Sequence, residues 1–224
     1  GLDPKEVTIA SALKDYGYST ACIGKWHLGH LKKYMPLNHG FDFFYGIPYS
    51  NDMRPEGKWD YARENFPPLP FLDGFDTLGV SLDQSNFIKM FTKKSIEFIH
   101  KNKNQPFFLY LAHTAPHTPL MLSEENKGLS ARGSYGDVVE EIDRSVGEIL
   151  NTLKKLNIAQ NCSILLLKNV ENEIQYNCTY CDFKTLKKFN LTRHYDICKN
   201  RKSFENEEIR RLQKIITEKE HIQQ

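Results

Sequence analysis

Two short apolar runs constrain the fold of this chain more than any other feature. Residues 20–23 and 107–112 are nearly free of polar side chains, and each run follows a helical pattern, over 7–16 and 82–101. Apolar runs without alternation are typical of strands buried on both faces of a parallel sheet. A strong amphipathic helical pattern follows over 138–153. This alternation predicts an α/β fold whose ligands bind at the carboxyl ends of the strands.

Two other segments complete the predicted layout. Residues 34–79 are rich in Pro, Gly, Asn and Tyr and predict a long, folded surface loop. Residues 163–167 predict another buried strand. No run of about 18 apolar residues occurs, so we expect no membrane span.

Cysteine and charge divide the chain unevenly. Residues 1–167 carry 18 Lys and Arg against 19 Asp and Glu, whereas residues 168–224 carry 12 against 9, and the last proline is Pro119. Three of the five cysteines fall within 178–198, which favours a metal site over a disulfide framework. We therefore expect a boundary near Lys168. The predicted units are 1–167, a zinc-finger segment at 168–204 and a charged helical tail at 205–224.

Two polar loops follow the predicted strands. Lys25 and His27 flank Trp26 in the first loop, and His113 and His117 flank Pro116 in the second. A cation and imidazoles that converge at strand ends suit an anionic substrate, because Lys binds phosphate or sulfate as a point charge. Each of these histidines taken singly is more readily explained as a structural residue.

Four sequence blocks around these loops resemble the sulfatase family, most closely its arylsulfatase A and steroid sulfatase branch. The blocks read, in order, GYSTACIGKWHLG (17–29), PLNHGFDFFYGIPYSNDMRP (36–55), QPFFLYLAHTAPHTPL (105–120) and SYGDVVEEIDRSVGEIL (134–150). The resemblance implies that residues 1–167 form part of an alkaline-phosphatase-like parallel-sheet core. It also implies a sulfuric ester hydrolase that acts on sulfate esters and uses calcium.

The resemblance assigns roles to four residues. Lys25 and His27 match the family's Lys and His that contact the sulfate and the nucleophile, and Ser50 matches a serine at the sulfate pocket. His117 matches the histidine that protonates the leaving group, whereas His113 has the structural interpretation. Three carboxylates are expected to be turn, cap or surface groups rather than calcium ligands: Asp52, Asp137 and Asp143.

The chain also departs from the family pattern. No cysteine stands in the family's C-x-P-S-R motif, which supplies the formylglycine nucleophile, and no S-x-P-x-R replaces it. We expect this motif and the paired Asp of the calcium site upstream of Gly1. The Asp-Asn pair expected after the strand at 163–167 is replaced by Lys168-Asn169. We therefore expect a fragment without sulfate ester turnover of its own.

The C-terminal segment has a different chemistry. Its spacing C-x2-C-x12-H-x3-C resembles a C2H2-class zinc finger of ββα fold with cysteine as the fourth ligand. A hairpin presents two thiolates and one helix face presents the other two ligands, which closes a tetrahedron around zinc. Phe183 and Leu191 would supply the small core. The expected ligands are Cys178, Cys181, His194 and Cys198.

The finger offers an alternative function, a nucleic-acid-binding or protein-binding module fused to an inert sulfatase remnant. Basic and polar side chains in or before its predicted helix could reach nucleic acid. They are Lys184, Lys187, Lys188, Asn190 and Arg193. The two halves imply different compartments, secretory or lysosomal for the sulfatase blocks and cytosolic or nuclear for thiolates on zinc. A gene fusion and a faulty gene model both account for this join.

Overall fold

The fold is described from a computed structural model of the chain, which describes residues 1–53, 66–165, 176–177 and 184–185. The chain divides into two compact units, Gly1–Asn157 and Ile158–Gln224. The predicted boundaries at 168 and 205 stay predictions, because both lie outside the described residues.

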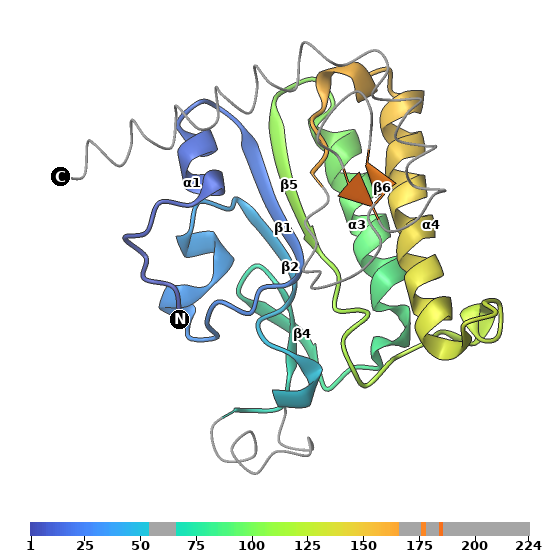
Figure 1. Cartoon of the computed structure of the whole chain (residues 1–224). Coiled ribbons are helices and arrows are strands. Elements are labelled where there is room, and N and C mark those ends of the chain that lie inside the picture. Colours follow the sequence, from blue (N-terminus) through green and yellow to red (C-terminus); the bar gives the residue numbers. More distant parts are fainter. Residues whose placement is uncertain (54–65, 166–175, 178–183, 186–224) are drawn as a thin grey trace. The chain divides into compact units, whose positions relative to one another are not determined.

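The first unit contains a five-stranded sheet in the order β4-β3-β2-β1-β5 (Figure 1). The central strand β1 pairs in parallel with β2 and with β5, whereas β3 and β4 continue the sheet beyond β2 in antiparallel fashion. The strands are β1 Ser19–Lys25, β2 Phe43–Ile47, β3 Pro70–Asp73, β4 Asp76–Val80 and β5 Phe107–Ala112. The predicted α/β class with a parallel sheet is therefore confirmed in its core, and the whole sheet is mixed.

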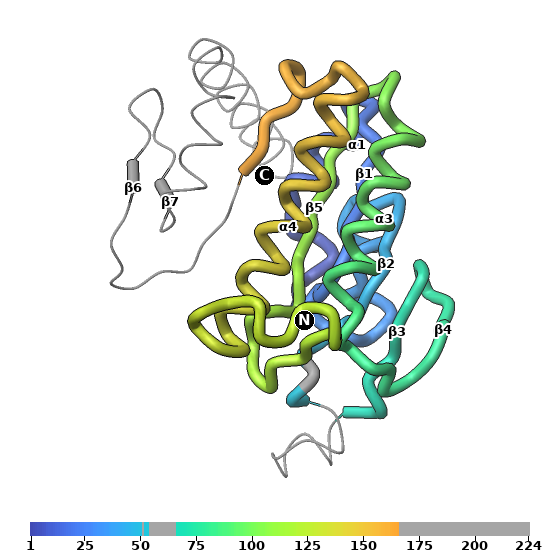
Figure 2. The backbone as a smooth tube through the Cα atoms, turned by 90° about the vertical axis from the view of Figure 1, so that its right-hand side faces the viewer, coloured from blue at the N-terminus to red at the C-terminus, as the bar shows by residue number. Residues whose placement is uncertain are grey.

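Helices cover both faces of this sheet. Helix α1 (Ile9–Lys14) lies on one side, and α3 (Phe87–Asn102) packs on the other, with α4 (Gly133–Lys155) beside it (Figures 1 and 2). Alternate residues of β1 enter the two resulting cores, since Ala21 and Ile23 belong to one apolar cluster and Cys22 belongs to the other. Burial on both faces explains why this strand shows no polar alternation.

Short 3-10 helices occupy the connections. They are η1 Lys32–Tyr34, η2 Pro36–Asn38, η3 Asn51–Met53, η4 Gln84–Asn86, η5 Glu124–Asn126 and, in the second unit, η6 Ala159–Asn161. The second unit also contains β6 (Tyr176–Asn177), which pairs antiparallel with β7 (Lys184–Thr185). In the part of the chain that the structure describes, no helix is both long and apolar enough to cross a membrane.

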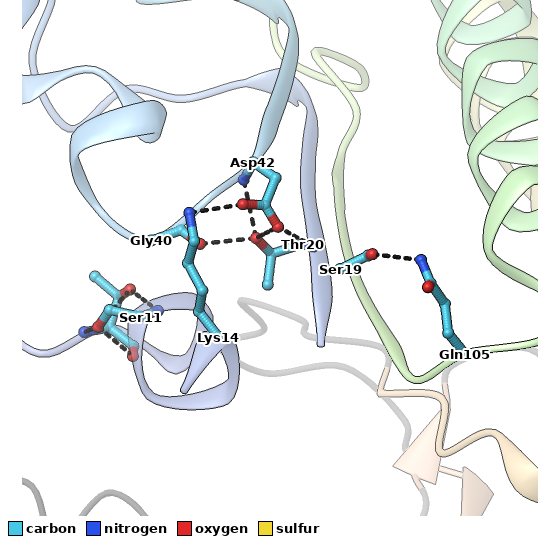
Figure 3. A network of polar contacts seen from close by, with 8 residues as sticks. Ser11, Lys14, Ser19, Thr20, Gly40, Asp42 and Gln105 are labelled. Carbon is cyan, nitrogen blue, oxygen red and sulfur yellow. Dashed lines mark hydrogen bonds and ion pairs between the residues drawn. The ribbon is translucent and has the colours of Figure 1, made fainter. Parts of the chain in front are cut away.

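A polar network fixes the amino end of β1 (Figure 3). Thr20 Oγ1 donates to the carbonyl of Gly40 over 2.7 Å, and the backbone N–H of Thr20 donates to Asp42 Oδ2 over 3.0 Å. Lys14 Nζ reaches the other oxygen of Asp42 at 2.6 Å, which ties α1 to the segment that leads into β2. This network lies at the amino end of β1, whereas the predicted site follows the carboxyl ends of the parallel strands. Its role is therefore structural.

Three expectations about elements are corrected. Residues 34–79 are not a surface loop, because β2, β3 and β4 lie within them and β2 is central to the sheet. Strand β5 is only half-buried, because among the described residues it is the edge strand, with Tyr110 36% exposed. The predicted strand at 163–167 is wrong over 163–165, which are irregular, and Leu165 is 63% exposed.

Candidate functional site at the carboxyl ends of the parallel strands

The three parallel strands end at the same edge of the sheet, and each is followed by predicted site residues. Lys25 is the last residue of β1, with His27 two residues further on. Ser50 lies three residues beyond the end of β2, and the loop after β5 carries His117. Because parallel strands share their carboxyl edge, the topology brings these side chains to one region of the surface.

Two glycines allow the strand ends to approach closely. Gly24 of β1 stands beside Gly46 of β2 and Ala112 of β5 in the parallel register. A Cβ on Gly46 would lie 1.9 Å from the carbonyl oxygen of Gly24, and a Cβ on Gly24 would lie 1.9 Å from that of Ala112. Only glycine fits at either position. Gly24, which precedes Lys25, is therefore held by close backbone contact with β2 on one side and with β5 on the other.

His27 adopts a backbone conformation that non-glycine residues rarely take, with φ at +61°. Its N–H donates to the carbonyl of Pro48 over 3.0 Å, and the N–H of Trp26 donates to Ile47 O over 3.0 Å. Trp26 is 5% exposed, and its Nε1 donates to Tyr34 O over 2.7 Å. Left-handed strain of this kind persists only where the surroundings enforce it, and it concentrates at functional sites.

The charges of this edge act on one another. Burial lowers the pKa of Lys25, and the nearby carboxylate of Asp52 opposes that shift. The pKa of His27 is lowered mainly by burial and then by the Lys25 charge, while Asp52 raises it and His117 lowers it. The charges of Lys25, Asp52 and His117 therefore all act on His27, and the charge of Asp52 also acts on Lys25.

The remaining predicted residues differ in exposure. Ser50 is buried, at 2% exposure, and its carbonyl accepts from Met53 N over 3.1 Å at the start of η3. His117 is exposed, and its Nδ1 lies 2.6 Å from the carbonyl oxygen of Thr118. Since a carbonyl only accepts, the Nδ1 of His117 carries a proton in this contact.

His113 has a different environment from His117. Its Nε2 lies 3.1 Å from Ser145 Oγ, which lies 2.5 Å from Thr92 Oγ1, and Thr92 donates to the carbonyl of Ile88 over 2.6 Å. Because Thr92 uses its proton on that carbonyl, Ser145 donates to Thr92 and His113 donates to Ser145 through an Nε2–H. Burial lowers the pKa of His113 to about 4. This arrangement agrees with the structural interpretation of His113.

The three carboxylates set aside from the sequence have different surroundings. Asp137 is buried and accepts from Gly128 N at 2.9 Å and Ser130 N at 2.7 Å, so it closes the loop before α4 as a turn carboxylate does. Asp143 is half-buried on α4. Asp52 is half-buried in the first turn of η3, and its Oδ1 is buried without a hydrogen-bond partner among the described residues. The sequence signal that could have pointed to Asp52 was its place two residues beyond Ser50.

A cavity of about 440 Å³ borders His27. The aromatic side of its wall is formed by His30, Tyr49 and Phe66, whose ring centroids lie 5.0 to 5.7 Å apart. A larger cavity of about 800 Å³ lies between the start of α3 and residues 120–127, and none of the predicted site residues lines it. Of these two cavities, the smaller therefore shares a wall with the candidate site.

Metal binding was predicted at two places, calcium by family resemblance and zinc in the C-terminal segment. Among residues 1–53, 66–165 and the short β6 and β7 strands, no three His, Cys, Asp or Glu side chains gather in a way that could hold a metal ion. The four expected zinc ligands lie outside the described residues: Cys178, Cys181, His194 and Cys198.

Comparison with known proteins gives a consistent assignment. The family model described as Sulfatase matches residues 1–167. The chain is 35% identical over 173 residues to N-acetylgalactosamine-6-sulfatase of Canis lupus familiaris, covering 72% of this chain and 32% of that protein. It is 31% identical over 229 residues to steryl-sulfatase of Homo sapiens, covering 73% and 39%.

A solved structure shares the fold. The crystal structure of the PsFucS1 sulfatase from Pseudoalteromonas sp. superposes with a TM-score of 0.61 at 25% identity, covering 70% of this chain and 36% of that one. The chain spans about a third of the length of the curated relatives it matches.

Proposed function

Because the chain belongs to the sulfatase family, we propose that its first 167 residues form the sulfate-binding part of a sulfuric ester hydrolase site. One observation carries the proposal. The carboxyl ends of three adjacent parallel strands supply Lys25 and His27, then Ser50, and then His117. Ligands of open α/β sheets bind at this edge.

Each of the four residues has a chemical role in this proposal. The ammonium of Lys25 and the hydroxyl of Ser50 bind sulfate oxygens, with Lys25 supplying the positive charge. His27, fixed by its backbone bond to Pro48, contacts the sulfate from the neighbouring side. His117 is placed to protonate the ester oxygen: where a nucleophile attacks sulfur and the S–O bond to the alcohol breaks, the Nε2–H of His117 would pass to the alcohol oxygen, so that the alcohol leaves neutral.

We further propose that residues 1–224 bind a sulfate ester without hydrolysing it. The nucleophile motif C-x-P-S-R does not occur among them, and hydrolysis by this family needs that nucleophile. The family usually binds a divalent metal, calcium. The described residues do not gather a ligand set for it, so we assign no step and no residue to calcium.

Binding and turnover test the proposal separately. We expect the purified chain to bind inorganic sulfate by isothermal titration calorimetry, and Lys25→Met to weaken binding at least about tenfold. Lys93→Met removes the same charge from an exposed position on α3 and serves as the matched control. Equal binding by Lys25→Met and wild type would refute the site. Hydrolysis of an aryl sulfate above a His117→Ala control would refute the absence of turnover.

A second function, a zinc-finger binding module, is supported by one observation in the C-terminal unit. Strands β6 and β7 pair antiparallel, with Tyr176 opposite Thr185 and Asn177 opposite Lys184. The sequence that joins them, 178–183, contains both cysteines of the C-x2-C motif. A two-stranded hairpin with this motif between its strands is the first half of a ββα finger.

Zinc stoichiometry tests this second function. We expect one zinc per chain by atomic emission after dialysis, lost in Cys178→Ser and retained in Cys162→Ser. A stoichiometry near zero in wild type, purified with zinc and reductant present, would refute the finger. Nucleic acid binding then follows as a separate measurement on the zinc-loaded chain.

A further inference from the structure

Asp52 is an acidic residue at the candidate site with a buried carboxylate oxygen that no described donor satisfies. It lies in η3, two residues beyond Ser50, with its Oδ1 buried and without a hydrogen-bond partner among the described residues. Asp137 shows the usual use of such a group, since both of its oxygens accept backbone N–H donors. A buried acceptor without a donor carries an energetic penalty, which marks such positions as functional candidates.

The groups that sense Asp52 are the proposed sulfate ligands. Its charge acts on Lys25 at the end of β1 and on His27 in the loop that follows, and His27 also senses His117 from the loop after β5. These are the charged or titratable groups whose mutual influence the structure shows at this edge. Asp52 therefore places one negative charge close to Lys25, the lysine of the proposed anion site.

A negative charge at this place does not help to bind an anion, but it changes which anion binds. A sulfate monoester carries one negative charge at neutral pH, whereas a phosphate monoester carries nearly two above its second pKa of about 6. Lys25 attracts both ligands, and Asp52 repels the phosphate ester with about twice the charge. Like-charge repulsion against the wrong ligand is a common source of specificity.

We propose that Asp52 is a specificity-determining residue, which makes the site select monoanionic sulfate esters over dianionic phosphate esters of the same carbon skeleton. The inference rests on the proposed function, because it needs Lys25, His27 and Ser50 to form an anion site. It goes beyond that function because it assigns the choice between two ester classes to one carboxylate.

Phenyl sulfate and phenyl phosphate form a matched pair of probes for this choice. Their dissociation constants are measured by calorimetry at pH 7.5 on the full chain, in wild type and in Asp52→Asn. We expect both ligands to bind the variant more tightly, and the phosphate-to-sulfate affinity ratio to rise about tenfold. Asp76→Asn makes the same change in net charge at an exposed position of β4 and should leave the ratio unchanged.

Two further variants keep the test decisive if Asp52→Asn folds poorly. Asp52→Ser removes the charge with a smaller side chain and should raise the ratio, while Asp52→Glu keeps the charge and should retain the wild-type ratio. A ratio that does not follow the charge at position 52 overturns the inference. Loss of both ligands in the two neutral variants, with retention in Asp52→Glu, also overturns it, because Asp52 would then only position Lys25.

The proposed function fails in a different way. If wild type binds neither phenyl ester, or if Lys25→Met binds both as wild type does, the anion site itself is refuted. If wild type binds phenyl sulfate through Lys25 but the ratio ignores position 52, only the inference about Asp52 is refuted.

Discussion

The N–H of His27 donates to the carbonyl of Pro48 over 3.0 Å and so joins the loops that follow β1 and β2. This bond continues the parallel pairing of the two strands past their ends, together with the bond from Trp26 N to Ile47 O. Lys25 and Ser50 are thereby held on either side of a backbone connection rather than on two independent loops. The geometry of the candidate site depends on main-chain contacts, so backbone substitutions there should affect it strongly.

Gly46→Ala should prevent the strand ends from closing. The added methyl group would lie 1.9 Å from Gly24 O, and the atoms that it meets are backbone of the central strand β1, which is paired on both sides. We expect a loss of at least about 3 kcal/mol in the free energy of unfolding, measured by urea denaturation. Gly128→Ala is the matched control, because Gly128 also has positive φ but nothing lies within 4 Å of its Cβ position. Its cost should be about 1–2 kcal/mol. Equal losses in the two variants would contradict the steric argument.

Stability should decrease as the pH falls from about 6.5 to 4, in part because of His113. Burial lowers the pKa of this histidine to about 4, from an ordinary value of 6.5, so the unfolded chain binds the proton more readily. The stability that this pKa difference contributes is fully present above the unfolded pKa of 6.5. About 3 kcal/mol of it is lost as the pH falls from there to about 4. Urea denaturation at pH 7.5 and 4.5 measures it.

His113→Gln tests the assignment of that pH dependence. Glutamine keeps an N–H that can reach Ser145 but does not titrate, so the stability difference between the two pH values should shrink. His100→Gln, on the exposed side of α3, should leave the difference as in wild type. An unchanged difference in His113→Gln would assign the effect to other groups.

The sequence predicted the elements whose patterns are unambiguous. The apolar run at 107–112 became β5 with the same bounds, and the periodic pattern at 138–153 lies inside α4. Residues 43–47 were missed, because Phe43-Phe44-Tyr45-Gly46-Ile47 contains a glycine and stands among turn-forming residues. That glycine marks the close approach of β1, a tertiary contact that local propensity does not encode.

The candidate site was predicted only in part, because some of its residues are brought together by tertiary contacts that the local sequence does not encode. Lys25 and His27 follow the first apolar run and His117 follows the second, so the parallel pairing of β1 with β5 brings the two segments to the same end of the sheet. The place of Ser50 depended on family resemblance, because β2 itself was not predicted. The burial of the Asp52 Oδ1 atom is a property of the folded chain, which no local sequence pattern reports.

Ser145→Ala should destabilise the packing of α4 against α3 and the loop after β5. Ser145 is buried and links His113 to Thr92, so its removal leaves the Nε2–H of His113 without an acceptor. An unpaired buried donor costs about 1–3 kcal/mol, which urea denaturation at pH 7.5 resolves. In the double variant Ser145→Ala with His113→Leu the orphaned donor is gone, so the two losses should not add. Additive losses would show that the two residues do not interact.

Asp137→Ala should open the loop that precedes α4 without unfolding the sheet. The carboxylate accepts the N–H groups of Gly128 and Ser130, and the Ser130 bond is the main reason that its pKa lies below the ordinary value. These two amides should lose hydrogen-exchange protection by about tenfold or more, while amides of β1 keep theirs. In wild type the same protection should be present above the ordinary Asp pKa and fall as the pH drops through the lowered one. Asp143→Ala, on the same helix, serves as the control, and equal exchange at Gly128 and Ser130 in the two variants would contradict the clamp.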